Sequence, residues 1–200
     1  MREVGRRTIS CTAALALVAI CGGGCGGGDQ ESSSAPSGPS AAKVCARIPA
    51  TRVEGLVAHA SSRAAPELRP SATGSAQLIK CAYKAKGVDV DLNLDLAANS
   101  RKRFDNRITE MTQFSTGRPA TFPRPVRGVG DARSGNQGAQ WVPALDQLLA
   151  YRPGRYLIVD FTAPGAPDTA NRDGAATLAR FAFPVLPRNP HAAAERPTPG

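Results

Sequence analysis

The chain has 200 residues, of which 42% are hydrophobic, and a formal net charge of +9. This length suits one globular domain with terminal extensions. The chain contains only two histidines and no CxxC pair, which argues against a zinc site and against a thioredoxin-like redox site.

The N-terminal segment has the layout of an export signal. Three arginines precede an apolar run at residues 9–20, and glycines follow it. This run is shorter than the ~17 to 25 residues that a transmembrane helix needs. We therefore predict a signal peptide over residues 1–24 rather than a membrane-spanning helix.

Two cysteines lie where this signal would be cleaved, an arrangement that resembles the lipobox of bacterial lipoproteins. In that family a leucine-like residue at −3 and a small residue at −1 precede the acylated cysteine. Residues 18–20 fit the first position before Cys21 but place the bulky Ile20 at −1, whereas the glycines at 22–24 fit only the −1 position before Cys25. The resemblance favours Cys25 over Cys21 as the lipidation site. Ordinary secretion without lipid is the alternative.

Such an anchor implies that the domain is attached to membrane lipid at the extracytoplasmic face of the cell membrane, because two or more acyl chains give stable binding. Residues 25–42 are rich in Gly, Ser and Pro and predict a flexible linker. Residues 187–200 contain four prolines and predict a disordered tail. The globular domain is expected over residues 43–186.

Two cysteines remain inside this domain. Cys11 leaves with the signal and one of the next two cysteines is acylated, so Cys45 and Cys81 are the pair that is left. An even pair in an exported domain predicts a disulfide. Closing a loop of this size stabilises a fold by about 3 to 4 kcal/mol in the chain-entropy model.

The domain begins with a predicted helix and a hairpin. Helical spacing of apolar residues covers 49–59, where Thr51 and Glu54 fit a capping box. The segments 77–84 and 87–97 follow as two strands, and the second alternates apolar and polar residues throughout.

Helical spacing returns at residues 99–113, and prolines then mark a loop. Three strands and a closing helix are predicted after it, at 139–142, 148–152, 155–162 and 168–183. Strand pairs that alternate with helices predict a single α+β domain with a mostly antiparallel sheet and helices packed on one face.

This layout resembles small actinobacterial lipoproteins that carry a domain of unknown function. The resemblance covers about residues 44–186 and also includes a tyrosine-rich hairpin and an alanine-rich final helix. It implies an envelope domain with a disulfide, and it brings no established activity and no catalytic residues. Its key positions are an early cysteine, a Cys-x-aromatic strand and a GxGD turn: Cys45, Cys81, Tyr83, Gly128, Gly130 and Asp131.

The predicted second strand carries four polar side chains on one face: Asp89, Asp91, Asn93 and Asp95. Their spacing matches positions 1, 3, 5 and 7 of a calcium loop, but Leu94 replaces the glycine at position six and Ser100 replaces the glutamate at position twelve. A solvated strand face is therefore favoured over a metal site. Lys80 and Lys84 on the neighbouring strand are expected to form cross-strand pairs with these acids.

No motif for catalysis or for a cofactor stands out. His59 is the only histidine of the domain and no GxSxG motif is present, which disfavours a catalytic triad. Gly128, Gly130 and Asp131 lack the GxGxxG continuation of a nucleotide loop and indicate a turn. We therefore expect no enzyme activity.

Charge gives the remaining functional indication. Removal of residues 1–24 leaves a net charge of +7, with arginines spread along the mature chain. A tethered basic domain is attracted to anionic lipid or wall polymer, while plain solubility explains the same composition. Nucleic acid is not an expected partner, because no aromatic residues interleave with the arginines. We expect a non-catalytic envelope module that binds a protein, a wall component or a small apolar ligand between sheet and helices. An accessory lipoprotein that damps an envelope-stress signalling system is the alternative.

Overall fold

The computed structural model describes residues 40–64, 66–75, 77–114, 121–131 and 138–189. The predicted signal peptide, both candidate lipidation sites Cys21 and Cys25, and residues 190–200 lie outside the described residues. None of the helices in the described ranges has the length and apolar character needed to cross a membrane.

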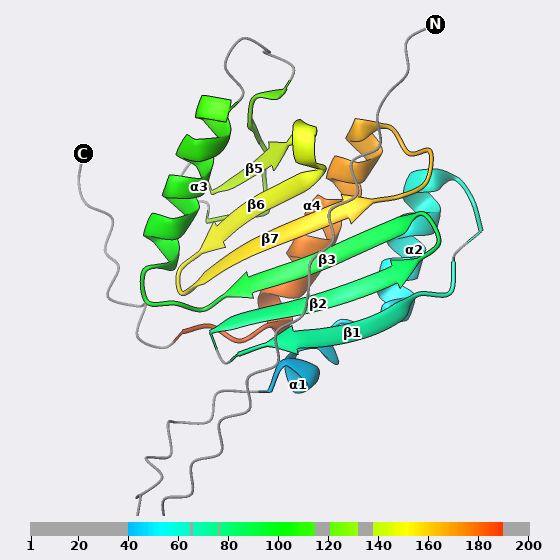
Figure 1. Cartoon of the computed structure of the whole chain (residues 1–200), viewed down its shortest axis with the longest axis horizontal. Helices are drawn as coiled ribbons and strands as arrows, with labels where there is room; N and C mark the ends of the chain where they lie inside the picture. Colours follow the sequence, from blue (N-terminus) through cyan, green and yellow to red (C-terminus); the bar gives the residue numbers. More distant parts are fainter. Residues whose placement is uncertain (1–39, 65, 76, 115–120, 132–137, 190–200) are drawn as a thin grey trace, which may run out of the picture. The chain divides into compact units, whose positions relative to one another are not determined.

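The described residues form an α+β domain built on one antiparallel sheet (Figure 1). The helices are α1 (Ala41–Cys45), α2 (Ala50–Ser61), α3 (Ser100–Phe114) and α4 (Asp168–Val185), with a short 3-10 helix η3 (Pro143–Leu145). The strands are β1 (Arg69–Gly74), β2 (Leu78–Ala85), β3 (Val88–Asp95), β4 (Arg124–Pro125), β5 (Ala139–Val142), β6 (Gln147–Arg152) and β7 (Arg155–Thr162). Their order in the sheet is β1-β2-β3-β7-β6-β5-β4, and every neighbouring pair is antiparallel.

The main core lies on one face of this sheet, under α1, α2 and α4. Alternate residues of β3 and β7 supply its floor, including Val90, Leu92 and Val159, and α4 contributes Leu178 and Phe183. These side chains are almost fully buried because period-2 alternation directs one complete side of each strand into the core.

α3 lies on the opposite face of the sheet. Phe104 and Met111 of α3 pack against Leu149 and Tyr151 of β6 and Tyr156 of β7, and together they form a second, smaller core. The prediction that the helices share one face therefore holds for α2 and α4 and is wrong for α3; α1 was not predicted. The physical reason is that β6 and β7 are apolar on both sides, so each side requires a cover.

The predicted disulfide between Cys45 and Cys81 is present, with 5.4 Å between the two Cα atoms. It joins α1 to β2 across 36 positions of the chain. In this way it fixes the N-terminal end of the domain to the inner face of the sheet.

Two local features differ from the sequence predictions. The capping box at Thr51 is wrong, because Pro49 precedes α2 without a side-chain cap and Glu54 instead accepts a hydrogen bond from the Leu68 amide. Strand β1 was not predicted, because the segment RPSATG contains proline and glycine and no apolar alternation. It is an exposed edge strand, where such residues are tolerated.

The folded body also extends beyond both predicted boundaries. Ser40 caps α1, which begins at Ala41 inside the predicted linker. At the other end Asn189 donates hydrogen bonds to the carbonyl oxygens of Gly154 and Leu96, which ties the first residues of the predicted tail to the sheet. Proline content alone did not reveal these backbone contacts, because both acceptors come from distant loops.

Candidate functional site

The face of the sheet that lies opposite the main core is polar over one half, and none of the described helices packs on that half. α3 packs on β6 and β7, whereas β1, β2 and β3 are not covered on that side (Figure 1). We call this polar half the open face. Its members are Lys80 and Lys84 of β2, Asp89, Asp91, Asn93 and Asp95 of β3, Gln147 of β6 and Asp160 of β7.

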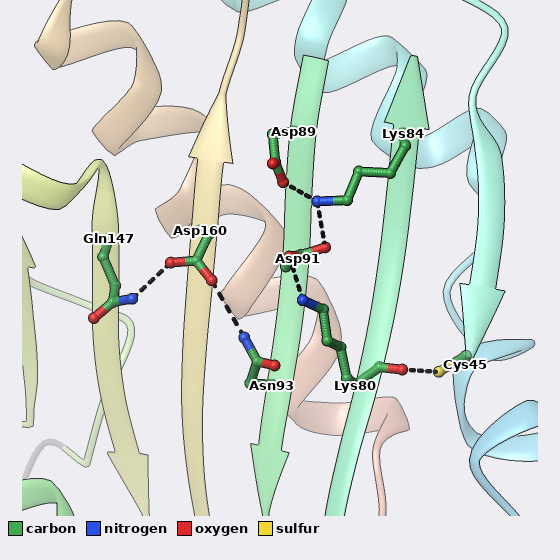
Figure 2. A network of polar contacts seen from close by, with 8 residues as sticks. All are labelled: Cys45, Lys80, Lys84, Asp89, Asp91, Asn93, Gln147 and Asp160. Atoms are coloured by element: carbon green, nitrogen blue, oxygen red, sulfur yellow. Dashed lines mark hydrogen bonds and ion pairs between the residues drawn. The ribbon is translucent and has the colours of Figure 1, made fainter. Parts of the chain in front are cut away.

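The hairpin register aligns the lysines with the acids. Lys84 lies directly opposite Asp89, and Lys80 lies opposite Asn93, one step along the same face from Asp91. The side-chain amines of Lys80 and Lys84 lie 2.7 Å and 2.9 Å from the two carboxylate oxygens of Asp91, and Lys84 also pairs with Asp89 (Figure 2). The predicted cross-strand pairs are therefore confirmed.

Asp91 is only 6% exposed although no helix lies above it. The stems of Lys80 and Lys84, each of which is less than half exposed, extend over it from β2. A buried carboxylate with two cationic partners is stable only while at least one partner remains. The arrangement therefore gives Asp91 a reserve partner if either lysine moves away.

A second acid, Asp160, faces Asp91 across the β3–β7 pairing. Gln147 donates a hydrogen bond of 2.6 Å to one oxygen of Asp160, and Asn93 donates one of 3.2 Å to the other (Figure 2). Burial raises the pKa of Asp160 above its ordinary value, the bond from Gln147 lowers it, and the charge of Asp91 raises it again. The two amides stabilise the Asp160 carboxylate by hydrogen bonds and so offset part of its repulsion by the facing carboxylate of Asp91.

The disulfide lies directly beneath this network. The sulfur of Cys45 is 3.7 Å from the carbonyl oxygen of Lys80 (Figure 2). A sulfur in a disulfide carries no hydrogen to donate, so this is a packing contact. It means that the strand that presents Lys80 is held by a covalent link on its inner face.

A pocket opens where the open face meets α3, and we call it the α3 pocket. It has a volume of about 240 Å³. Lys80 and Asp95 of the open face line it, together with Leu78, Tyr156 and, from α3, Arg103. The Arg103 guanidinium lies 2.9 Å from the buried Asp95 carboxylate, which ties α3 to the end of β3.

Tyr156 is 4% exposed, and its hydroxyl has no hydrogen-bond partner among the described residues. Its ring packs edge-on against Phe104 at 5.6 Å between centroids, so its position is fixed. Burial raises the pKa of Tyr156, and the hydroxyl therefore keeps its proton at neutral pH.

His59, the residue on which a catalytic triad would depend, lies elsewhere. It lines a separate pocket of about 260 Å³ between α2 and α4, where Asp173 is the single acid. The convergent acids that hydrolytic chemistry would need around His59 are not found in that pocket. In the described part of the chain, no group of three or more His, Cys, Asp or Glu side chains is arranged to hold a metal ion.

The GxGD segment forms a turn, as the sequence predicts. Gly128 has a φ of +71°, and a side chain on Gly130 would collide with the backbone of Gly138. The Asp131 amide donates to the carbonyl of Tyr151. The segment therefore closes the loop against β6, and it contributes nothing to the open face.

No protein-family model, no curated protein and no solved structure matches this chain. Strand alternation in the sequence indicated the two lysines and the β3 acids, but it did not indicate Asp160, Gln147, Arg103 or Tyr156. Their contribution to the site depends on which strands pair and on which side of the sheet α3 covers. The one sequence signal for this arrangement was the continuous apolar run in β6 and β7, which is typical of strands buried on both faces.

Proposed function

We propose that this protein is a lipid-anchored, non-catalytic binding module on the extracytoplasmic face of the cell membrane, whose open face contacts an envelope protein or a wall component. The observation that carries the proposal is the open face itself. It is a structured polar surface formed by β2, β3 and the adjoining parts of β6 and β7, and the described helices leave it uncovered while they cover both sides of the rest of β6 and β7.

The pairing of its charges supports a role in recognition. Every charged member of the open face is held by an ion pair or a hydrogen bond to another side chain. Such pairing holds the charged groups in defined positions, which favours specific recognition of a partner. Asp91 keeps one cationic partner if the other lysine turns toward that partner.

The N-terminal features support the membrane location. The charged start, the short apolar run and the cysteines at 21 and 25 match a lipoprotein signal. The net charge of +7 expected after removal of residues 1–24 favours contact with anionic lipid or wall polymer.

Photo-crosslinking in intact cells tests the proposal. A benzophenone amino acid is placed at Thr73, which is exposed on β1 and lies opposite Lys80 on the open-face side. The matched control places it at Thr51, which is exposed on α2 and belongs to the opposite side of the sheet. We expect a discrete crosslinked product from position 73 only. Identical products from both positions, or none from either, contradict a binding role for the open face.

The identity of the product separates this proposal from the alternative. A sensor kinase or an anti-sigma protein at position 73 favours the accessory regulator of an envelope-stress system. A wall polymer or a protein without a signalling domain favours the simple binding module.

A further inference from the structure

The α3 pocket combines an apolar wall with a polar end. Leu78 is 49% exposed at its edge, although it is a large aliphatic side chain, and Ile158 lines the floor. The volume of about 240 Å³ equals roughly eight water molecules at liquid density. A pocket of this size accommodates a small organic molecule rather than a polymer chain.

The polar end contains more hydrogen-bond donors than acceptors. Arg103 uses one terminal nitrogen on Asp95, and Lys80 uses its amine on Asp91. A guanidinium has five N–H donors and an ammonium has three, so both residues retain donors. The Tyr156 hydroxyl is a further donor without a partner among the described residues.

The carboxylates nearby are already engaged. Asp95 accepts from the Ala97 amide with one oxygen and pairs with Arg103 through the other. Asp91 retains Lys84 as a second cationic partner, so Lys80 is free to turn toward a ligand without leaving a buried carboxylate unpaired. A site with surplus donors, two of them cationic, selects an anionic acceptor.

We propose that the α3 pocket binds a small amphipathic carboxylate. Its two oxygens accept hydrogen bonds from Lys80, Arg103 and Tyr156, and its branched or aromatic apolar group lies against Leu78 and Ile158. This inference rests on the proposed binding function and names the ligand class that the function requires. The carboxylate belongs either to a free organic acid or to the C-terminal end of a peptide, which present the same chemistry to the pocket.

Calorimetric titration of the purified full-length protein tests the inference. The probes are N-acetyl-L-leucine, which mimics a peptide terminus, 4-methylpentanoate, which is a free acid of similar shape, and N-acetyl-L-leucinamide, which lacks the charge. We expect the two carboxylates to bind at least tenfold more tightly than the amide. A preference for N-acetyl-L-leucine over 4-methylpentanoate identifies a peptide end as the source, and equal binding identifies a free acid.

Two variants with the same charge change locate the site. Lys80→Met removes a donor that lines the pocket, whereas Lys86→Met removes an equivalent charge from the exposed turn between β2 and β3, outside both the pocket lining and the Asp91 ion pairs. We expect an approximately tenfold loss of carboxylate affinity for Lys80→Met and less than a twofold loss for Lys86→Met. Tyr156→Phe is expected to weaken binding roughly tenfold or more, because it deletes one hydrogen bond to a charged group.

Several results overturn the inference: no binding of either carboxylate, equal binding of the amide, or equal losses in the two lysine variants. Circular dichroism of each variant establishes that it is folded before titration. If the carboxylates do not bind but the crosslink from Thr73 is still formed, this inference is wrong and the proposed function stands. If the carboxylates bind but no crosslink is formed, the proposed contact with a protein or the wall is wrong and the ligand pocket stands.

Discussion

Two buried tyrosines of the sheet differ in one respect, the partner of the hydroxyl. The Tyr83 hydroxyl donates a hydrogen bond of 2.8 Å to the carbonyl oxygen of Ile48, whereas the Tyr156 hydroxyl has no partner in the described part of the chain. Burial raises the pKa of Tyr83 to about 12. Both hydroxyls are therefore protonated at neutral pH, and only one of them contributes a hydrogen bond to the fold.

This contrast predicts opposite effects of the same substitution. Tyr83→Phe leaves the Ile48 carbonyl without its donor and is expected to lower the free energy of unfolding by about 1 to 3 kcal/mol. Tyr156→Phe removes a buried polar atom that has no partner and is expected to leave stability unchanged or to raise it. Urea unfolding of the two variants measures the difference. Equal destabilisation would show that the Tyr156 hydroxyl is engaged in the free protein.

At the scale of elements, α4 approaches β7 closely through one glycine. A Cβ atom on Gly174 would lie 2.6 Å from ring atoms of Phe161, which is fully buried. The ring has no open space into which to move, because interiors are closely packed. Gly55 of α2 provides the opposite case, since nothing lies within 4 Å of a Cβ placed there.

The two glycines form a matched pair of helix substitutions. Gly55→Ala is expected to stabilise the protein by about 0.5 to 1 kcal/mol, because alanine restricts the unfolded chain and favours the helix. Gly174→Ala gains the same stabilisation of the helix backbone, but it overpacks the contact between α4 and β7. We therefore expect the free energy of unfolding to fall by about 1 to 2 kcal/mol. Thermal unfolding of both variants measures the signs. A stabilised Gly174→Ala variant would mean that α4 moves away from the sheet readily.

The link between α1 and β2 gives a second prediction at this scale. Replacing Cys45 and Cys81 together with serine is expected to lower the free energy of unfolding by about 3 to 4 kcal/mol, because the 36-residue loop is no longer closed in the unfolded chain. Urea unfolding without reductant compares the variant with the parent protein. Reduced parent protein should match the variant, and no loss in either would exclude a stabilising role for the disulfide.

At the scale of the whole molecule, the open face couples pH to stability through Asp160. Its pKa is raised in the folded state, so the folded protein retains this proton to higher pH than the unfolded chain does. The contribution of Asp160 to the free energy of unfolding therefore falls as pH rises. The fall begins near pH 4, which is about the ordinary pKa of aspartate, and is complete above the raised pKa of the folded state.

Asp160→Asn removes this dependence. The variant is expected to gain stability relative to the parent protein as pH rises above about 4, because the repulsion from Asp91 and the desolvation of the charge are absent. Urea unfolding over a pH series measures the difference. Asp89→Asn, on the same face but exposed, is the control and should show a smaller change. If the difference in free energy of unfolding between parent and variant does not change with pH, Asp160 is not the source of the pH dependence.

The proposed membrane attachment is also tested on the whole chain. The intact mass of protein extracted with detergent is expected to match a chain that begins at Cys25, or at Cys21, with a diacylglyceryl group attached. Replacement of only one of these two cysteines with alanine should release the protein from the membrane. A lipid-free chain in the culture medium would exclude the anchor and would remove the membrane-proximal part of the proposed function.

The sequence alone determined most of the elements and part of the open face. Period-2 alternation in β3 placed its four polar residues on one side, and the short connection to β2 brought Lys80 and Lys84 opposite them. These features are local, because strand periodicity and hairpin register depend on residues close together in the chain.

Only the tertiary structure decided the rest. Asp160 reaches Asp91 because β7 pairs with β3, and the α3 pocket exists because α3 covers the side of the sheet opposite to α4. An amphipathic helix shows that it has an apolar stripe but does not show which side of a sheet receives it. The local pattern therefore gave the polar strand, while long-range pairing and helix placement turned it into a network bordered by a pocket.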